Sequence, residues 1–544
     1  MKYLTFKSNN KTKKITLLDL IATRLNCLNC RGANPLRHNK RFAYLFIWLL
    51  FFSFSTQSLL LSQNLRDLRI LHINDTHATN IPFQVNNKEV PEIPDSIMMV
   101  GGAAYLKAYV DKNRDLNTIF LGAGDYAQGS PASSITKGKS QIEILNYMAL
   151  DAVTLGNHEF DYSTDTLLHF LKDSRYKMIN CNLVEKVTGK LLFDPYKIIT
   201  KNEVKVAIIG VMSEDLPELV IKGAVSEIDV LEIIPTVKKY IAKIKELEKP
   251  NLILLLSHAG YFVDQQIAEA IPELDIIVGG HTHTRIPHPA KHNRTIICQA
   301  GEKSKYLGVL DLKVDVDNDS VYSFLGKLVP IITDYIQPDT IVARIVDSID
   351  TECLKGFNEI IGELKNDWVR RYNQESNIGN WITDMILDFS QADVAFYNSG
   401  GIRKNLNAGP ISIKDVWEIT PFENSVVYFY IRGDSLYNLF EFQVSDSAQR
   451  LQIAGAEYKY NLNNPKGKRI VDLKINKQEI LPFKIYKVAT NNFVFSQPIK
   501  HFGFDLEPTQ MTDCEVYVRD LFISYVRKQK VIDSKIENRI VQVY

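Results

Sequence analysis

Four short apolar segments in the first 300 residues each run into a cluster of polar side chains. The segments lie at residues 69–73, 118–122, 251–256 and 275–278. Their continuous apolar character is typical of strands buried on both faces, as in a parallel sheet covered by helices. Between them, the apolar spacing of residues 231–247 predicts an amphipathic helix. The pattern predicts an α/β fold, in which ligands bind at the carboxyl ends of the strands.

The polar clusters contain residue types that bind metal ions. Asp75 and His77 lie two positions apart, so their side chains point to the same side of an extended segment. His281 and His283 repeat this spacing after two glycines. Two carboxylates, one amide oxygen and four imidazoles suit borderline divalent metals such as zinc, manganese or iron. The predicted ligands are Asp75, His77, Asp125, Asn157, His258, His281 and His283.

Seven ligands are too many for one tetrahedral ion and match two ions that share an aspartate. Two dications against two carboxylates leave a positively charged pocket, which suits a phosphate. Two metal ions about 3.5–4 Å apart activate a bridging water and hold both oxygens of an in-line displacement. The set therefore predicts hydrolysis of a phosphate ester.

Residues 154–161, TLGNHEFD, predict a catalytic pair beside the metals. His158 follows the ligand Asn157 directly, so it cannot easily bind the same ion and should face the substrate. Asp161, three residues further on, would hold one tautomer of the imidazole and raise its basicity. His158 would then stabilise phosphate charge or protonate the leaving oxygen, while Glu159 is expected to bind backbone amides in the turn.

These motifs resemble the metallophosphoesterase domain of the secreted 5′-nucleotidase family. The motifs that carry the resemblance are Asp75-x-His77, Gly124-Asp125, Gly156-Asn-His-Glu-Phe-Asp161, His258 and Gly280-His-Thr-His283. It continues into Asn398-Ser-Gly-Gly-Ile-Arg403 and Pro421-Phe422 and covers residues 66–544.

The resemblance implies a specific arrangement of ligands and domains. One ion would be held by Asp75, His77, Asp125 and His283, and the other by Asp125, Asn157, His258 and His281. Two divalent ions such as zinc or manganese are the implied cofactors, with His158 and Asp161 as the catalytic pair. The implied fold is an α/β/β/α sandwich at residues 66–336, a linker helix at 337–362 and a smaller mixed α/β substrate-binding domain at 363–544.

In that family the second domain binds the nucleoside, stacks its base between two phenylalanines and rotates between open and closed positions. Asn398, Arg403 and Phe422 match the family pattern. Tyr372 replaces a family arginine, and Arg371 is the candidate substitute. A glycine-rich turn of the family is missing as well, which leaves Phe504 as the candidate for the second ring.

The resemblance implies a nucleotide substrate and 5′-nucleotidase activity. The alternatives are a 2′,3′-cyclic-nucleotide 2′-phosphodiesterase with 3′-nucleotidase activity, or a UDP-sugar or nucleoside diphosphate hydrolase. The missing turn also suggests a different class of protein, a catalytically silent nucleotide-binding surface protein. The complete ligand set argues against that last alternative.

The amino end indicates export. Residues 1–42 are basic and residues 43–62 are apolar, which is typical of a signal peptide or signal-anchor, the one predicted contact with a membrane. We expect a periplasmic or cell-surface location. The formal net charge of +1 gives no indication of a nucleic acid polymer as partner. The sequence leaves open the oligomeric state and the pairing of Cys181, Cys298, Cys353 and Cys514.

Overall fold

The computed structural model describes residues 64–94, 97–221, 223–446 and 448–544. The fold below is that of the compact unit Leu65–Tyr544. The basic extension and the signal or anchor segment, residues 1–62, lie outside the described residues. Within the described ranges, every helix is too short or too polar to cross a membrane.

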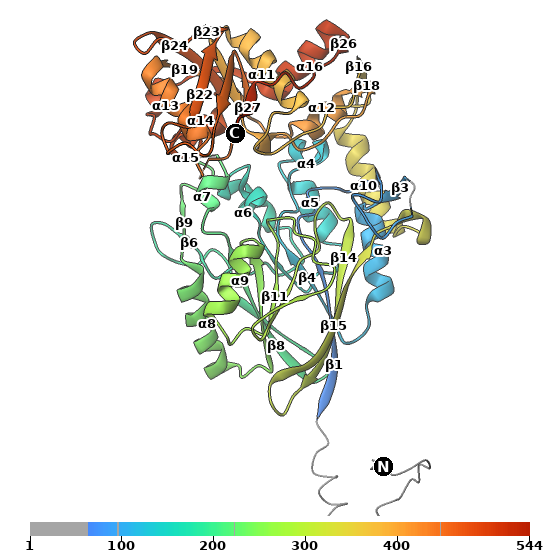
Figure 1. The fold of residues 1–544 in the computed structure, drawn as a ribbon. Coiled ribbons are helices and arrows are strands. Elements are labelled where there is room, and N and C mark those ends of the chain that lie inside the picture. The colour runs from blue at the N-terminus through green and yellow to red at the C-terminus, as the bar shows by residue number, and fades with distance from the viewer. Residues whose placement is uncertain (1–63, 95–96, 222, 447) are drawn as a thin grey trace, which may run out of the picture. The chain divides into compact units, whose positions relative to one another are not determined.

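Two large sheets form the first part of this unit (Figure 1). Sheet A consists, in spatial order, of β15 (Ser320–Pro330), β14 (Tyr306–Asp315), β1 (Leu65–Ile73), β4 (Thr118–Ala123) and β5 (Ala152–Thr154). Sheet B consists of β12 (Ala290–His292), β13 (Thr295–Cys298), β11 (Ile276–Val278), β10 (Leu252–His258), β8 (Val204–Met212) and β7 (Tyr196–Lys201). The four predicted strands correspond to β1, β4, β10 and β11. In sheet A β1 pairs in parallel with β4, and in sheet B β10 pairs in parallel with β11, so the carboxyl ends of each pair lie at one edge.

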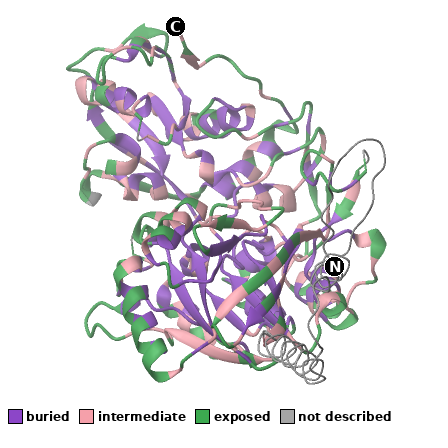
Figure 2. Ribbon diagram, turned by 60° about the horizontal axis from the view of Figure 1, so that its bottom comes forward, coloured by how far each residue is buried: buried purple, intermediate pink, exposed green. Residues whose placement is uncertain are grey.

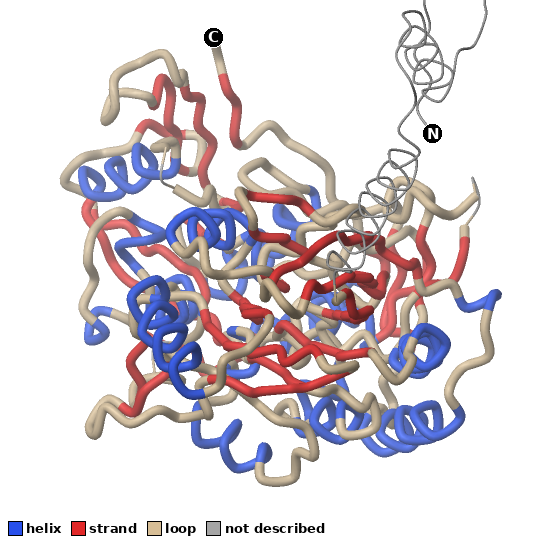
Figure 3. Tube along the Cα trace, turned by 90° about the horizontal axis from the view of Figure 1, so that it is seen from below, coloured by secondary structure: helices blue, strands red, loops and turns tan. Residues whose placement is uncertain are grey.

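The two sheets pack face to face, with helices on both outer faces. Leu254 of β10 lies in the core between the sheets, whereas its neighbour Leu255 packs in the core beneath α8 (Ile233–Leu247) and α9 (Tyr261–Ala270). The outer face of sheet A is covered by α3 (Ala103–Asn113), α5 (Lys139–Leu145) and α6 (Thr164–Leu171). Buried residues concentrate in the strands (Figure 2), and helices lie outside them (Figure 3). The predicted four-layer α/β/β/α sandwich is confirmed.

The amphipathic helix predicted for residues 231–247 is α8. Its apolar face is buried against sheet B, and its lysines project into solvent because they fall on the opposite face. The buried side chains of α8 are Ile233, Thr236, Val237, Tyr240, Ile241 and Ile244. Shorter elements complete the first part: β2 (Phe83–Val85), β3 (Met98–Val100), α4 (Pro131–Ile135), η1 (Asn157–Phe160), β6 (Leu183–Glu185), α7 (Leu216–Leu219), β9 (Ile228–Val230) and η2 (Thr333–Tyr335).

A helix, α10 (Thr340–Cys353), connects the two parts of the unit. Asp339 begins it, because its carboxylate accepts hydrogen bonds from the backbone amides of Ile341 and Val342 at 3.0 and 2.8 Å. The helix is shorter than the predicted span of 337–362. It ends before Gly356, whose φ of +89° does not continue a helix, and a strand begins at Ile360.

The second part is a mixed α/β region, as predicted. Its largest sheet has the order β20 (Gln452–Ala454), β17 (Val394–Tyr397), β24 (Ile485–Asn491), β19 (Ser425–Arg432) and β25 (Thr512–Tyr517). Two smaller sheets are formed by β18 (Gly409–Ser412), β16 (Ile360–Leu364) and β26 (Val531–Ile532), and by β23 (Gln478–Glu479), β22 (Ile470–Ile475), β21 (Ala456–Tyr460) and β27 (Ile540–Gln542). The helices are α11 (Asn377–Ser390), η3 (Ser399–Gly401), α12 (Ile413–Ile419), α13 (Gly433–Gln443), α14 (Asn492–Ser496), α15 (Pro498–Phe502), η4 (Pro508–Gln510) and α16 (Val518–Gln529).

The described cysteines are not paired. Cys181 and Cys298 are buried in the sandwich, while Cys353 and Cys514 are partly exposed. All four are free thiols in the structure. The fold of residues 65–544 is therefore held by its packed layers without a disulfide among the described cysteines.

Candidate metal centre and substrate cavity

All seven predicted ligands lie at or just beyond the carboxyl end of a strand in sheet A or B. The turns that carry them are bonded to one another. The backbone amide of Asp75 donates to the carbonyl of Gly124 at 2.9 Å, and that of His77 donates to the carbonyl of Asp125 at 3.0 Å. The amide of His281, after β11, donates to the carboxylate of Asp75 at 3.0 Å. Loops from both sheets therefore converge at one edge of the sandwich.

The side chains form two overlapping groups that share Asp125. In each group the candidate ligand atoms lie within 4.8 Å of one another. The Nε2 atoms of His77 and His283 approach to 2.8 Å, and Asn157 Oδ1 lies 3.0 Å from His281 Nδ1. A cluster of imidazoles and carboxylates with facing ring nitrogens fits a divalent metal. The two groups are Asp75, His77, Asp125 and His283, and Asp125, His258 and His281.

The backbone at the site is held in an unusual conformation. Five of the seven predicted ligands have a positive φ, between +47° and +78°, a region that residues other than glycine seldom occupy. Such strain is typical of functional sites, where the surrounding structure imposes it. The five residues are Asp75, His77, Asp125, His281 and His283.

Gly156 allows the close approach of β5 to Asp125. A Cβ atom at this position would lie 2.1 Å from Asp125 Oδ1 and 2.4 Å from its backbone nitrogen. The glycine of the Gly156-Asn-His motif is therefore required by the space that Asp125 occupies.

In two of the histidines Nδ1 contacts an oxygen acceptor, and this contact directs Nε2 towards the carboxylates. His258 Nδ1 lies 2.6 Å from the carbonyl oxygen of Ala123, and its Nε2 lies 3.3 Å from Asp125 Oδ2. His283 Nδ1 lies 3.0 Å from Glu302 Oε2, and its Nε2 lies 3.5 Å from Asp75 Oδ1. Glu302 was not singled out from the sequence, because a glutamate 19 positions after His283 carries no recognisable spacing.

The predicted pair of His158 and Asp161 is in contact. His158 Nδ1 lies 2.8 Å from Asp161 Oδ2, and the backbone amide of His158 donates to Asp125 Oδ1 at 3.0 Å. Burial alone would lower the pKa of His158, but the carboxylates of Asp161 and Asp125 raise it above its ordinary value. The ring is therefore suited to carry a proton at the wall of the cavity described below.

Glu159 has the structural role predicted for it. Its carboxylate accepts hydrogen bonds from four backbone amides, at 2.6 to 2.9 Å. This carboxylate ties the turn after β4 to the turn after β5 and so fixes Asp125 relative to Asn157. The donors are the amides of Asp125, Tyr126, Ala127 and Gly156.

The charges within the cluster are strongly coupled. Burial alone would lower the pKa of His258, but the facing carboxylate of Asp125 raises it to about 10. Burial and the charge of His258 lower the pKa of His281 to about 3. A cation that binds Asp125 and His258 displaces the proton of His258, so binding of a metal ion should release protons.

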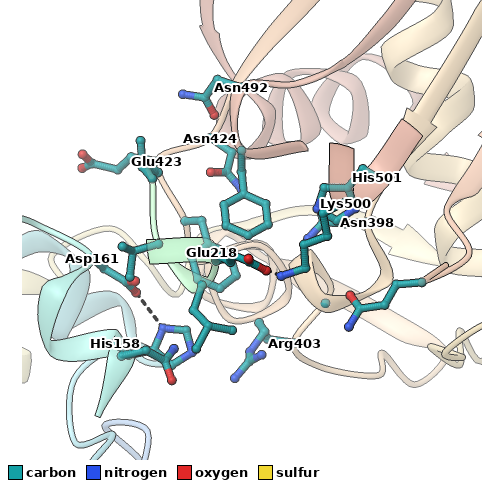
Figure 4. Close-up of a pocket in the computed structure, with 18 of the residues that line it drawn as sticks. His158, Asp161, Glu218, Asn398, Arg403, Glu423, Asn424, Asn492, Lys500 and His501 are labelled. Atoms are coloured by element: carbon teal, nitrogen blue, oxygen red, sulfur yellow. Dashed lines mark hydrogen bonds and ion pairs between the residues drawn. The ribbon is translucent and has the colours of Figure 1, made fainter. Parts of the chain in front are cut away.

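A cavity of about 820 Å³ opens beside this cluster, between the two parts of the unit (Figure 4). The first part contributes Asp125, Asn157, His158, Asp161, His281 and His283, and the second part contributes Tyr372, Asn398, Arg403, Phe422, Phe493 and Lys500. The guanidinium carbon of Arg403 lies 5.9 Å from the centre of the Phe422 ring, which itself lies 5.9 Å from the His158 ring. The predicted residues Asn398, Arg403 and Phe422 thus share a cavity with the metal cluster.

Two candidates from the sequence do not reach this cavity. Phe504 packs against Phe502, with ring centres 6.4 Å apart, because the left-handed Gly503 turns the chain back onto the core. Phe493, in α14, lines the cavity instead. Arg371 is exposed and absent from the lining, where Tyr372 stands. Sequence reasoning missed Phe493 and Lys500 because neither lies in a motif.

Contacts between the two parts border the cavity. Lys500 Nζ donates to the backbone carbonyl of Glu218 at 3.0 Å, and Gln497 Nε2 donates to that of Val220 at 3.4 Å. A further contact joins the two parts, because Lys303 Nζ donates to the carbonyl of Arg403 at 3.3 Å. The position of Arg403 is therefore tied to the loop that carries Glu302.

The four-layer sandwich, with acids and histidines clustered at its strand ends, defines a metal-dependent phosphoester hydrolase. Residues 68–285 match the calcineurin-like phosphoesterase family. Residues 360–500 match the 5′-nucleotidase C-terminal domain. The chain therefore combines a calcineurin-like phosphoesterase domain with a 5′-nucleotidase C-terminal domain, as its resemblance to the 5′-nucleotidase family implies.

Known proteins resemble the chain over most of its length. A 5′-nucleotidase-related protein of Glossina morsitans morsitans is 27% identical over 88% of this chain and 95% of its own length. A 5′-nucleotidase of Vibrio cholerae is 29% identical over 71% of this chain and 78% of its own. The crystal structure of a 5′-nucleotidase precursor from Thermus thermophilus superposes with a TM-score of 0.78 at 27% identity, over 88% of this chain and 99% of that one.

Proposed function

We propose that the protein hydrolyses nucleoside 5′-monophosphates to a nucleoside and phosphate. The observation that carries this proposal is that the metal cluster and His158 border the same cavity as Arg403 and Phe422. The cavity thus offers a metal cluster and a guanidinium group that suit a phosphate, and an aromatic ring that suits a base. The two relatives and the solved structure described above are named 5′-nucleotidases or related to them, which supports the same substrate class.

We propose that two divalent ions, such as zinc or manganese, occupy the two ligand groups. Asn157 completes the second group, because its amide oxygen faces the His281 ring. When bound, two such ions neutralise phosphate charge and activate water for attack. One ion is assigned to Asp75, His77, Asp125 and His283, and the other to Asp125, Asn157, His258 and His281.

The remaining residues act on the substrate. Arg403 binds the anionic part of the nucleotide through its guanidinium group. Phe422 stacks on the base, with Phe493 as the second ring in place of Phe504. His158, oriented by Asp161, donates a proton to the leaving oxygen of the nucleoside. Asn398 lines the same cavity, and its side-chain oxygen accepts a hydrogen bond from Asn491 at 3.0 Å.

We further propose that residues 43–62 direct export to the periplasm or the cell surface, as a cleaved signal or as an anchor. Their apolar run after a basic segment supports this. We also retain the division into domains at residues 66–336 and 363–544 joined by 337–362. Support comes from the separate hydrophobic cores on either side of α10.

Chromatographic analysis of the products formed by the metal-loaded protein tests the activity. The substrates are AMP, 2′,3′-cyclic AMP, UDP-glucose and ADP. We expect the highest kcat/KM with AMP, loss of activity with EDTA and recovery on adding Mn²⁺. Faster hydrolysis of another substrate would assign the corresponding alternative activity. Nucleotide binding without hydrolysis of any substrate would favour the silent binding protein.

A further inference from the structure

Glu302 is not one of the predicted metal ligands, but its carboxylate contacts the predicted ligand His283. Its Oε2 is 3.0 Å from His283 Nδ1, and its Oε1 is 3.1 Å from Lys305 Nζ. The side chain is only 19% exposed. Because both oxygens are bonded, rotation of the carboxylate away from His283 would break two interactions.

His283 needs an orienting partner more than two of the other histidine ligands do. Its side chain is 29% exposed, whereas those of His77 and His258 are 2% and 0% exposed. Packing therefore holds His283 less firmly. Glu302 accepts a hydrogen bond from Nδ1–H of His283. The lone pair of His283 therefore lies on Nε2, which faces Asp75 and His77.

The loop that carries Glu302 is itself fastened to the turn after β1. The side chain of Asn74 donates to the carbonyl of Gly301 and accepts from the amide of Ala300, both at 2.7 Å. The amide of Lys303 donates to the carbonyl of Asp75, also at 2.7 Å. The carboxylate of Glu302 is thus held in place relative to Asp75.

We propose that Glu302 is a positioning residue that fixes the tautomer and orientation of His283 and strengthens metal binding by the group of Asp75, His77, Asp125 and His283. A carboxylate behind a metal-binding imidazole raises its basicity, and losing such a partner typically lowers metal affinity about 10–100-fold. This inference rests on the proposed function only in that the group binds a divalent ion.

The test measures Mn²⁺ binding to Glu302→Ala and Glu302→Gln by equilibrium dialysis. We expect Glu302→Ala to weaken one of two sites about 10–100-fold. Glu302→Gln keeps an acceptor for Nδ1–H but loses the charge, so its loss should be smaller. Glu418→Ala is the matched control, because Glu418 is 23% exposed and bonds Lys404 at 2.5 Å without touching a histidine. Its Mn²⁺ binding should equal that of the wild type.

Kinetics provide a second readout. If Glu302 acts through the metal, raising Mn²⁺ should restore kcat of Glu302→Ala while KM for AMP stays unchanged. Wild-type affinity at both sites in a folded Glu302→Ala protein would overturn the inference. Should that variant fail to fold, Glu302→Gln decides, and wild-type affinity there would overturn it equally.

The binding measurement separates this inference from the proposed activity. A wild-type protein that binds two Mn²⁺ ions but releases no phosphate would refute the activity and leave the role of Glu302 testable by dialysis. A wild-type protein that binds no Mn²⁺ would overturn both.

Discussion

His158 combines a fixed proton position with access to the substrate cavity. Asp161 holds its Nδ1 at 2.8 Å, and its raised pKa favours the protonated ring. It also lies outside both ligand groups. Its chemistry can therefore be removed without removing a metal ligand.

We expect His158→Ala to retain bound metal while kcat falls by a factor on the order of 10²–10⁴, the usual contribution of a positioned acid or base. Metal content by atomic absorption and kcat with AMP measure the two effects. His169→Ala, at an exposed position of α6, is the control and should match the wild type. Unchanged kcat in His158→Ala would contradict the assignment.

At the same scale, the sequence revealed ligands that follow apolar strands, although the i, i+2 pairs lie in left-handed turns and not in the extended segments that the spacing argument assumed. The i, i+2 pairs of Asp75 with His77 and His281 with His283 are visible because each follows an apolar strand. Glu302 carries no such signal, since only the folding of its loop against β1 brings it to His283. Phe493 lies in no motif, and the turn at Gly503, which directs Phe504 away from the cavity, leaves no spacing signal either.

Among the secondary-structure elements, β10 is buried on both faces. Leu254 packs between the two sheets, and Leu255 packs under the helices. This explains why its sequence is apolar without alternation. Truncating a side chain on either face would leave an empty space and lower the free energy of unfolding, because the neighbours on both sides are rigid strands or helices.

Leu254→Ala should lower the free energy of unfolding by about 2–5 kcal/mol, as expected for a leucine that is completely buried. Urea titration followed by circular dichroism measures the change. Leu247→Ala, at the end of α8 where the side chain is 62% exposed, provides the control. Its effect should stay within about 0.5 kcal/mol. Equal effects of the two substitutions would contradict the assigned burial.

Asp264 in α9, in the helix layer that covers sheet B, should make the free energy of unfolding depend on pH. Burial raises the pKa of Asp264 to about 7, although Ser257 donates a hydrogen bond to its carboxyl group at 2.6 Å. The pKa of Asp264 is therefore higher in the folded protein than in the unfolded chain. Its contribution to the free energy of unfolding is complete below about pH 4 and is lost as pH rises through about 7. Deprotonation then leaves a buried charge under sheet B.

Asp264→Asn should remove this dependence. The unfolding free energy of the variant minus that of the wild type should rise between pH 4 and 7, by up to about 1.4 kcal/mol per pH unit. Urea titrations of both proteins at pH 5, 6 and 7 give the difference. A difference that stays constant with pH would show that Asp264 keeps an ordinary pKa.

For the molecule as a whole, the metal centre links loops from both sheets and borders the second part. Ligands that bind only the folded state stabilise it through mass action. Metal ions held by residues at or just beyond the carboxyl ends of β1, β4, β5, β10 and β11 should therefore stabilise the whole sandwich. Strand and helix patterns are local, so they predicted an α/β fold, while its four-layer form was implied by the family resemblance. Contacts such as Lys500 with Glu218 depend on how the two parts meet and had no such signal.

Removal of metal with EDTA should lower the midpoint of thermal unfolding. Free Mn²⁺ at about 100 times its Kd contributes about 2.7 kcal/mol per site. Calorimetry with and without EDTA measures the shift. Asp125→Ala, which lacks the ligand common to both groups, should show little response to either Mn²⁺ or EDTA. A full response of that variant would rule out the shared ligand.

The left-handed backbone at Asp75, His77, Asp125, His281 and His283 has a consequence for engineering. None of these turns would keep its shape as a free peptide, because each conformation is imposed by neighbouring turns. Grafting one motif onto another scaffold would therefore transfer the residue types without their backbone conformation. The smallest transplantable version of this centre is the pair of sheets with the turns after β1, β4, β5 and β11 attached.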